Sequence, residues 1–262
     1  MAKKLFFLVL VYNISFNLPA QWKVIREVML DQTPTAFSAD INANIYIGYD
    51  DGSLVKYDDH GEELTNYALP NLSEISLIDP QFQLKTFLFY YDIQQITILD
   101  RLNSVPKNYS VKDLGTGLVN MACPAPDGTI WLIENNPMLL KRIDLNRKTL
   151  IQETQPSLGK DIRAMRTFQN ILLIVDESGL HILDQFGSTL FFYKGAGISS
   201  MSIWKNSVYL EHSNKIIKID LFDERVISTL ESPMKNIYRF IYVNKTYLFL
   251  MRNKLIYYQR TK

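Results

Sequence analysis

The sequence is poor in the residues that build covalent cross-links and metal centres. Its 262 residues include one cysteine, Cys123, and three histidines, His60, His181 and His212. A single cysteine excludes an internal disulfide and any zinc site made of several cysteines. Three histidines leave little material for metal binding or general-base catalysis. The sequence therefore predicts no cofactor, apart from weak binding of calcium by carboxylates.

Glycine and excess charge are also scarce. Only 11 glycines are present, which excludes collagen-like repetition, and an aromatic content of 12% with 47% hydrophobic residues excludes a disordered chain. The 28 basic residues balance 27 acidic ones. Because general affinity for nucleic acid or for anionic membranes needs a net basic surface, no nucleic-acid partner is expected.

The first twenty residues have the layout of a secretory signal. A basic start at Lys3 and Lys4 precedes an apolar core over residues 5–11 and a polar segment that ends at Ala20. This apolar core is shorter than the roughly 20 residues that cross a bilayer, so we expect no transmembrane segment after cleavage. The mature chain would begin at Gln21. No cysteine follows the cut, which predicts an exported protein of the periplasm or cell surface that is not a lipoprotein.

Short runs of β-branched and aromatic residues recur along the rest of the chain, and no amphipathic helix pattern of useful length appears. One run occurs six times, at residues 44–49, 86–91, 129–134, 171–176, 207–212 and 246–251. A second run follows each copy, and five of these end in an aspartate: Asp58, Asp100, Asp144, Asp184 and Asp220. The aspartates lie 36 to 44 residues apart. This period is typical of one four-stranded propeller blade, so the sequence predicts an all-β, six-bladed β-propeller.

Two further strands per repeat complete the predicted blade. Innermost strands are expected at residues 36–40, 162–166 and 198–202, and a polar outer strand after each aspartate, for example at residues 108–114. The sixth repeat ends without an outer strand. Residues 23–30 have the same alternating pattern as the outer strands, so we expect them to close the ring as one domain over residues 21–262. The alternative, a two-layer β-sandwich, explains neither the period nor the missing strand.

Residues 40–61 carry a motif with a known resemblance. Asp-x-x-x-x-Ile-Tyr-Ile, then Asp-Gly-Ser-Leu, then Lys-Tyr-Asp-x-x-Gly resembles the NHL-like and related six-bladed propellers of bacterial envelopes. The junction of Ala20 with Gln21 is similar to the signal junctions of exported proteins in Bacteroidota. The resemblance implies a secreted envelope propeller from that group.

Acidic residues follow the second strand of most repeats. In related propellers these loops lie on the same face as the entrance to the central channel, where carboxylates could ring a ligand or a calcium ion. The alternative is that each acid accepts hydrogen bonds from its own turn. The candidates are Asp50, Asp92, Glu134, Asp176, Glu211 and the adjacent His212.

The inner strands offer few catalytic groups. Six-bladed lactonases and lyases of this shape hold a metal with acids and amides that project into the channel, whereas the matching positions here are Ser38, Ser76, Asn120, Arg163, Ser199 and Tyr238. A ring without an acid lacks metal ligands and a general base. It suits a small polar or anionic ligand, held by Asn120, Arg163 and Tyr238. The sequence predicts a non-catalytic binding or scaffold module, and the alternative is a channel-centred, lactonase-like hydrolase or lyase acting on a small polar substrate.

A protein partner of the envelope is expected to bind the loops. The loop from Asn135 to Met138 is longer than its equivalents and is expected to expose Pro137 and Met138, and methionine adapts well to a binding surface. Glu211 and His212 complete the candidate partner site. The outer-strand residues 191–193 are a second candidate patch. Cys123 and His181 are expected to be packed in the core, and His60 to lie in a solvated turn.

Overall fold

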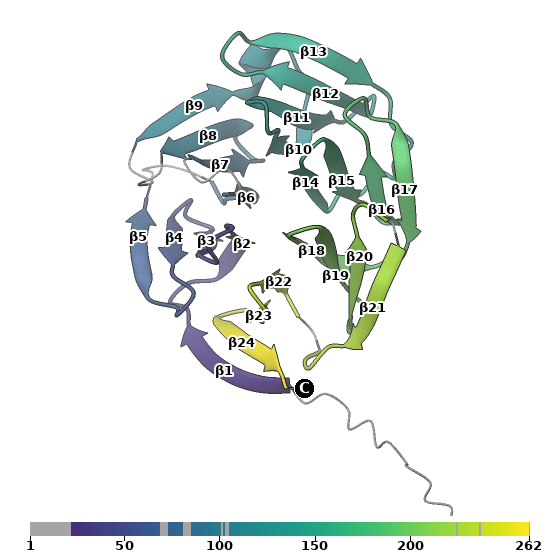
Figure 1. Cartoon of the computed structure of the whole chain (residues 1–262). Coiled ribbons are helices and arrows are strands. Elements are labelled where there is room, and N and C mark those ends of the chain that lie inside the picture. Colours follow the sequence, from purple (N-terminus) through teal and green to yellow (C-terminus); the bar gives the residue numbers. More distant parts are fainter. Residues whose placement is uncertain are drawn as a thin grey trace, which may run out of the picture.

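The computed structural model describes residues 22–68, 73–80, 85–100, 102, 105–223, 225–235 and 237–261. Six antiparallel sheets, each of four strands, stand in a ring (Figure 1). The predicted all-β, six-bladed propeller is confirmed, and the sandwich alternative is wrong because the strands form six separate sheets. The predicted export signal, residues 1–20, lies outside the described residues.

Each blade is ordered from the channel outward along the chain. The strands of the first three blades are β2 (Pro34–Ala39), β3 (Ile45–Tyr49), β4 (Leu54–Tyr57) and β5 (Glu63–Tyr67); β6 (Leu77–Asp79), β7 (Lys85–Tyr90), β8 (Gln95–Asp100) and β9 (Pro106–Ser110); and β10 (Val119–Pro124), β11 (Thr129–Glu134), β12 (Leu139–Asp144) and β13 (Thr149–Thr154). Those of the next two are β14 (Ala164–Phe168), β15 (Ile171–Val175), β16 (Gly179–Leu183) and β17 (Thr189–Lys194); and β18 (Ile198–Trp204), β19 (Ser207–His212), β20 (Lys215–Asp220) and β21 (Arg225–Glu231).

The sixth blade combines the two ends of the described chain. Its strands are β22 (Arg239–Val243), β23 (Thr246–Leu250), β24 (Lys254–Arg260) and, outermost, β1 (Trp22–Met29). Strand β1 pairs antiparallel with β24 from Trp22 opposite Arg260 to Met29 opposite Lys254, and the two ribbons lie side by side in Figure 1. The Trp22 ring meets Tyr247 edge-on at 4.8 Å between centroids, and its Nε1 donates to the Glu231 carbonyl of the fifth blade. Strand β1 thus contacts both the last blade and its neighbour.

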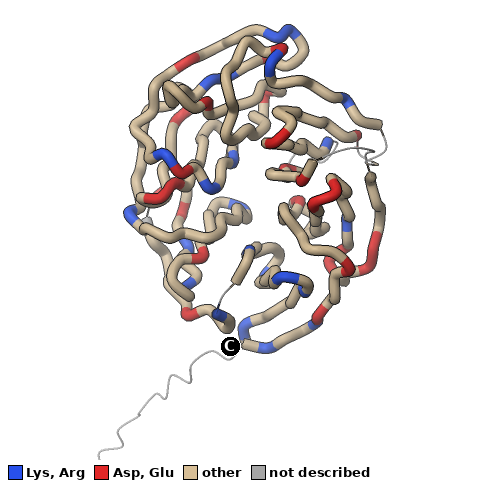
Figure 2. The backbone as a smooth tube through the Cα atoms, turned by 180° about the vertical axis from the view of Figure 1, so that it is seen from behind, with Lys and Arg blue, Asp and Glu red and all other residues tan. Residues whose placement is uncertain are grey.

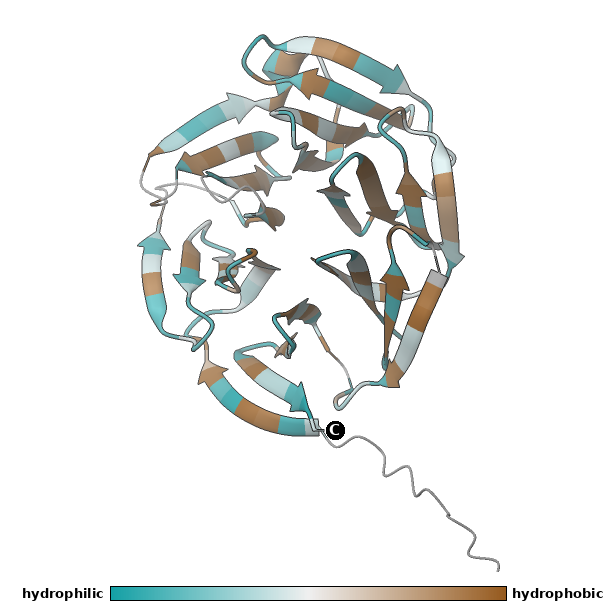
Figure 3. Ribbon diagram, in the orientation of Figure 1, coloured by the Kyte–Doolittle hydropathy of each residue, from teal (hydrophilic) through white to brown (hydrophobic). Residues whose placement is uncertain are grey.

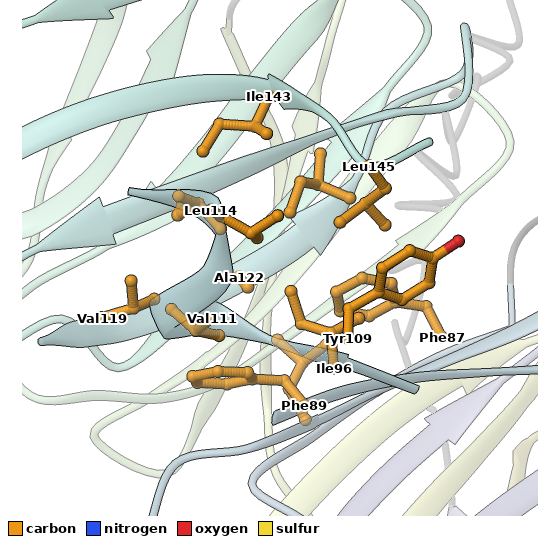
Figure 4. Packing of buried hydrophobic residues seen from close by; sticks show 13 residues of the cluster. Phe87, Phe89, Ile96, Tyr109, Val111, Leu114, Val119, Ala122, Ile143 and Leu145 are labelled. Carbon is orange, nitrogen blue, oxygen red and sulfur yellow. The ribbon is translucent and has the colours of Figure 1, made fainter. Parts of the chain in front are cut away.

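The apolar core is divided into six clusters, one between each pair of neighbouring blades. Figure 4 shows the cluster between the second and third blades, where Phe89 and Ile96 face Ala122 and Ile143. The second strand of each blade is almost entirely buried, whereas apolar and polar residues alternate along the outermost strands (Figure 3). The consecutive aromatic residues of the sequence are explained by this arrangement, because each sheet buries side chains on both of its faces.

The repeated aspartates fold the turn between third and fourth strands. The Oδ1 atom of Asp58 accepts the backbone N–H groups of His60 and Glu62, and Asp184 does the same for Phe186 and Ser188. Equivalent bonds reach Asp144 and Asp220. Aspartate is suited to this position because its short carboxylate reaches backbone donors two residues ahead. The repeat period in the sequence therefore arises from aspartates that accept hydrogen bonds in the equivalent turn of successive blades.

Several predicted strands differ from the structure by one or two residues at an end, and two of the differences affect the core or the site. Residues 108–114 do not form one outer strand: β9 ends at Ser110 and a 3-10 helix, η1 (Val111–Leu114), follows. Val111 and Leu114 are both buried, which a strand would prevent by turning one of them outward. The inner strand expected at 162–166 begins at Ala164 instead, which places Arg163 in the loop that precedes it.

Deleting residues 21–30 is expected to destabilise the whole ring, because the deletion uncovers β24 and removes the Trp22 ring from its aromatic neighbours. We expect a loss of about 3 kcal/mol or more in the free energy of unfolding, the usual cost of removing one large aromatic side chain from a core. Thermal and denaturant unfolding of a chain that begins at Asp31, compared with one that begins at Gln21, measures this. An unchanged midpoint would show that the ring is stable without β1.

Candidate functional site

The ring has two faces that differ in their connections. The face that carries the links between blades and the turns between second and third strands is called the loop face here. The opposite face carries the turns that follow the first and third strands and is called the turn face. Acidic and basic residues are interspersed around the ring (Figure 2).

The acids at the ends of the second strands hold the loop face together. Glu134 accepts the Gly117 N–H at 3.0 Å and forms an ion pair with Lys141 at 2.7 Å, and Gly117 lies in the link that enters its own blade. Glu211 accepts from the Asn214 N–H and from the Ser199 hydroxyl. Asp92 accepts from the Ser73 hydroxyl, whereas Asp50 is exposed. Most of these carboxylates are thus acceptors for turns and links.

Asp176 is the most heavily bonded of these acids. Its buried carboxylate accepts the backbone N–H groups of Gly159, Ser178 and Gly179, and it lies 2.8 Å from Nε2 of His181. Burial acts to raise the pKa of Asp176, but the bonds from Ser178 and Gly159 and the neighbouring His181 outweigh it, so its pKa lies below the ordinary value.

Ser178, His181 and Asp176 do not form a catalytic triad. The Ser178 hydroxyl lies 3.3 Å from Nε2 of His181, the same nitrogen that contacts Asp176. A triad needs the serine and the acid on opposite ring nitrogens. The His181 ring is buried and packs 4.5 Å from Phe192, as predicted for a core histidine. Within the described ranges, no three His, Cys, Asp or Glu side chains group as metal ligands.

The central channel has a cavity at each end. The loop-face cavity has a volume of 70 Å³ and the turn-face cavity one of 430 Å³. Phe37, Arg166 and Met201 line both. Arg166 spans the channel from β14 to β6, where it donates to the Ile78 carbonyl at 2.8 Å and pairs with the buried Asp79 at 3.7 Å. Arg166 therefore lies between the two cavities.

The structure distributes the predicted channel residues over different places. Ser76, Arg163 and Ser199 line the loop-face cavity, whereas Ser38 lines the turn-face cavity. Asn120 and Tyr238 line neither. Ser38 lines the other cavity from Ser199 because it lies near the end of β2, whereas Ser199 lies near the start of β18. The loop-face cavity also contains Arg239, which sequence reasoning missed although it follows Tyr238 directly.

The turn-face cavity was not predicted from the sequence. Its volume is within the range of small-molecule pockets, and its walls are mainly apolar. Four of the six inner strands contribute side chains at their ends, among them Phe37, Phe168, Trp204 and Tyr242. The alternating apolar pattern of these strands was the available signal, but it does not distinguish a core residue from a channel residue.

The residues expected to bind a partner lie on the loop face, but not all are accessible. The amides of Asn120 and Asn135 exchange hydrogen bonds, one of them at 2.6 Å, and Pro137 is exposed after a cis peptide bond. Met138 is half-buried and packs against the core between the third and fourth blades, so the expectation that it is exposed is wrong.

Glu211 and His212 have roles within the fifth blade. Glu211 is only 6% exposed, and its carboxylate is engaged by Ser199 and Asn214. His212 is half-buried and lies beside Gly195 in the preceding link, where an added Cβ would meet the His212 ring at 3.3 Å. Partner binding by these two residues stays a prediction.

Exposed apolar side chains gather beside Asn135 on the loop face. Leu118 is 50% exposed, and its carbonyl accepts the Asn135 N–H. Tyr91 and Ile93 are exposed in the neighbouring turn, which the Gln94 side chain fixes by bonds to Val119. We call Tyr91, Ile93, Leu118 and Pro137 the loop-face patch.

The second candidate patch is only partly exposed. Phe192 is exposed on β17, whereas Phe191 and Tyr193 are half-buried against the core of the fourth and fifth blades. Cys123 is fully buried, and burial raises the pKa of its thiol well above the ordinary value, which keeps it protonated. His60 lies in an exposed turn, as predicted.

Comparison with known proteins shows the fold alone. The sequence matches no protein-family model and no curated protein. Among solved structures, the chain is similar to the Pan2 WD40 domain of Neurospora crassa, with a TM-score of 0.66, 8% identity and coverage of 92% of this chain and 96% of that one. Virginiamycin B lyase from Staphylococcus aureus is similar with a TM-score of 0.64 at 12% identity, and the match covers 91% of this chain and 99% of the lyase. A chain of the mitotic checkpoint complex is similar with a TM-score of 0.68 at 7% identity, and the match covers 99% of this chain and 98% of that one. In the described part of the chain, no helix is long and apolar enough to cross a membrane.

Replacing Asp176 by asparagine is expected to destabilise the protein near neutral pH by about 1–3 kcal/mol, because the carboxylate serves several buried donors. Since the folded-state pKa of Asp176 is lowered, its stabilising effect is present above the unfolded pKa of about 4 and is lost as the pH falls through the folded value. Urea unfolding of both proteins at pH 7 and pH 3 should show a difference that shrinks at low pH. A difference that is equal at both pH values would contradict a role for the ionised carboxylate.

Removal of metal ions by a chelator is expected to leave the melting temperature unchanged, because backbone N–H groups and hydroxyls already donate hydrogen bonds to most of the loop-face carboxylates. Calorimetry with and without EDTA, together with elemental analysis of the purified protein, tests this. One tightly bound zinc or iron per chain would contradict it, whereas weak calcium binding at exposed Asp50 would not.

Proposed function

We propose that the protein is a non-catalytic binding module of the bacterial cell envelope, exported by its N-terminal signal, that docks a protein partner on its loop face. The observation that carries the proposal is the loop-face patch. Tyr91, Ile93, Leu118 and Pro137 expose apolar surface at the junction of the second and third blades. Grouped exposed apolar residues on a soluble scaffold favour protein contacts.

Rigid support beneath the patch favours binding further. Gln94 donates to the carbonyls of Tyr91 and Val119 and accepts the Val119 N–H, so it joins the two blades under the patch. The paired amides of Asn120 and Asn135 fix the next loop. A surface that is ordered before binding loses little conformational entropy when a partner docks.

The channel chemistry favours binding over catalysis. The described residues that line its two cavities include no histidine, glutamate or cysteine, and their one acid, Asp40, accepts bonds from Asn42, Asn44 and Tyr46. General acid–base catalysis most often uses a histidine or a carboxylate within reach of the substrate. The lactonase-like hydrolase or lyase is therefore the less favoured alternative.

The loop-face patch can be tested with a double variant and a matched control. Ile93→Ser with Leu118→Ser removes exposed apolar surface from the patch, and Ile227→Ser with Leu150→Ser removes side chains of similar exposure, 47% and 52%, from the outer strands. The partner is first captured by cross-linking in the native envelope and identified. Its purified form is then titrated against each protein.

The patch variant is expected to bind at least tenfold more weakly than wild type, because hot-spot apolar contacts contribute about 1–2 kcal/mol or more. The control variant should bind as wild type does, and all three proteins should unfold at similar temperatures. Undiminished binding by the patch variant, or a loss confined to the outer-strand control, would refute docking on the loop face.

A further inference from the structure

We infer that the loop-face cavity of the channel binds a small oxyanion, such as phosphate, sulfate or the carboxylate of a small acid. No residue of the loop-face patch lines this cavity, and the inference does not depend on a protein partner. Three arginines from two blades line the cavity: Arg163 and Arg166 from the fourth blade and Arg239 from the sixth. No carboxylate lines it among the described residues.

The acids that balance these arginines are engaged outside the cavity lining. Asp161 pairs with Arg163 at 2.8 Å on the exposed loop, and Asp79 is buried behind Arg166. Arg239 forms no ion pair within the described part of the chain, and its guanidinium lies 5.4 Å from the Tyr238 ring. An anion in the cavity would therefore gain the attraction of Arg239 without displacing an existing ion pair.

Two serines provide neutral donors in the same cavity. The Ser76 hydroxyl oxygen accepts the Tyr91 N–H at 3.0 Å, and that of Ser200 accepts the Phe240 N–H at 3.0 Å. Because these bonds use the oxygen as acceptor, the hydroxyl protons of both serines are available to donate. Arginines and hydroxyl donors together match the oxygens of an oxyanion.

The size of the cavity limits the ligand. Its volume of 70 Å³ is small beside the 430 Å³ of the turn-face cavity. It therefore suits a small oxyanion better than a nucleotide or a sugar. A larger ligand would place only its anionic group there. Phe37 and Met201 line both cavities and so lie between this cavity and the apolar turn-face end.

Isothermal titration with sodium phosphate, sodium sulfate and sodium acetate tests the site, with sodium chloride at equal ionic strength as the reference. Wild type is expected to bind at least one of the three oxyanions at a single saturable site and to melt at a higher temperature in its presence. Binding of phosphate and sulfate alone would assign a tetrahedral anion, and binding of acetate alone a carboxylate. If none of the three exceeds chloride, the inference is wrong.

Arg239→Gln is expected to weaken binding about tenfold or more, since a hydrogen bond to a charged group contributes roughly 1.5–3 kcal/mol. Arg239→Lys should retain part of the affinity. The matched control is Arg252→Gln, which removes an exposed arginine from the loop face of the same blade. Equal weakening by Arg239→Gln and Arg252→Gln would show a general charge effect and refute the site. If Arg239→Gln does not fold, Arg163→Gln gives the same test at an arginine that is 35% exposed.

Discussion

The burial of both faces of every sheet is the constraint on which the rest of this structure depends. A β-sheet with two apolar faces is stable only between two neighbours, and in a propeller each blade supplies that cover to the next. Six clusters, one at each junction, require a closed ring, because an open array would leave one face of the first blade and one of the last in water. Strand β1 contributes to the two junctions of the sixth blade. Leu30, directly after the strand, packs between the first and sixth blades, and Trp22 packs between the fifth and sixth blades.

Closing the ring brings the inner strands close together, and side chains bond across them. Thr167 donates to the Pro124 carbonyl at 2.6 Å, and Ser202 bonds both the N–H and the carbonyl of Tyr242. Arg166 reaches past the third blade to the second. These bonds satisfy backbone groups that face the channel, where no further strand is available to pair with them. The width of the channel is thus set by short side chains as well as by the number of blades.

The sequence was sufficient to predict the fold because local chemistry and global architecture share one period. Strand β11 and strand β19 have the bounds expected from their runs of β-branched and aromatic residues, and aspartates at the ends of five third strands accept hydrogen bonds from the following turns. The predicted strand bounds were wrong where the sequence pattern is compatible with more than one kind of local structure. Residues 111–114 place two apolar side chains three apart, which fits a helical turn as well as a strand, and burial of both decides for the turn.

The candidate site was less predictable, since it depends on the direction of single side chains. Ser38 and Ser199 occupy similar places in the repeat, yet a difference of a few residues along the inner strand assigns them to opposite ends of the channel. Met138 was expected outside because its loop is long, but that length lets it turn inward to the core. Tyr91 and Ile93 belong to the second repeat and Leu118 to the third, and only the packing of the second blade on the third brings them to one surface.

The loop-face carboxylates accept hydrogen bonds from the links between blades, and this bears on the charge around the channel arginines. Links between blades are rich in backbone N–H groups without a strand partner, and the carboxylates of Glu134, Asp176 and Glu211 accept from them or from nearby hydroxyls. None of these three carboxylates lines the loop-face cavity, and only Glu211 bonds to a residue that does, Ser199. Of the arginines that line the loop-face cavity, Arg163 pairs with Asp161 and Arg166 with Asp79, whereas Arg239 forms no ion pair within the described residues. The proposed anion site is consistent with this arrangement, because the loop-face carboxylates serve the links between blades and no carboxylate among the described residues lines the loop-face cavity.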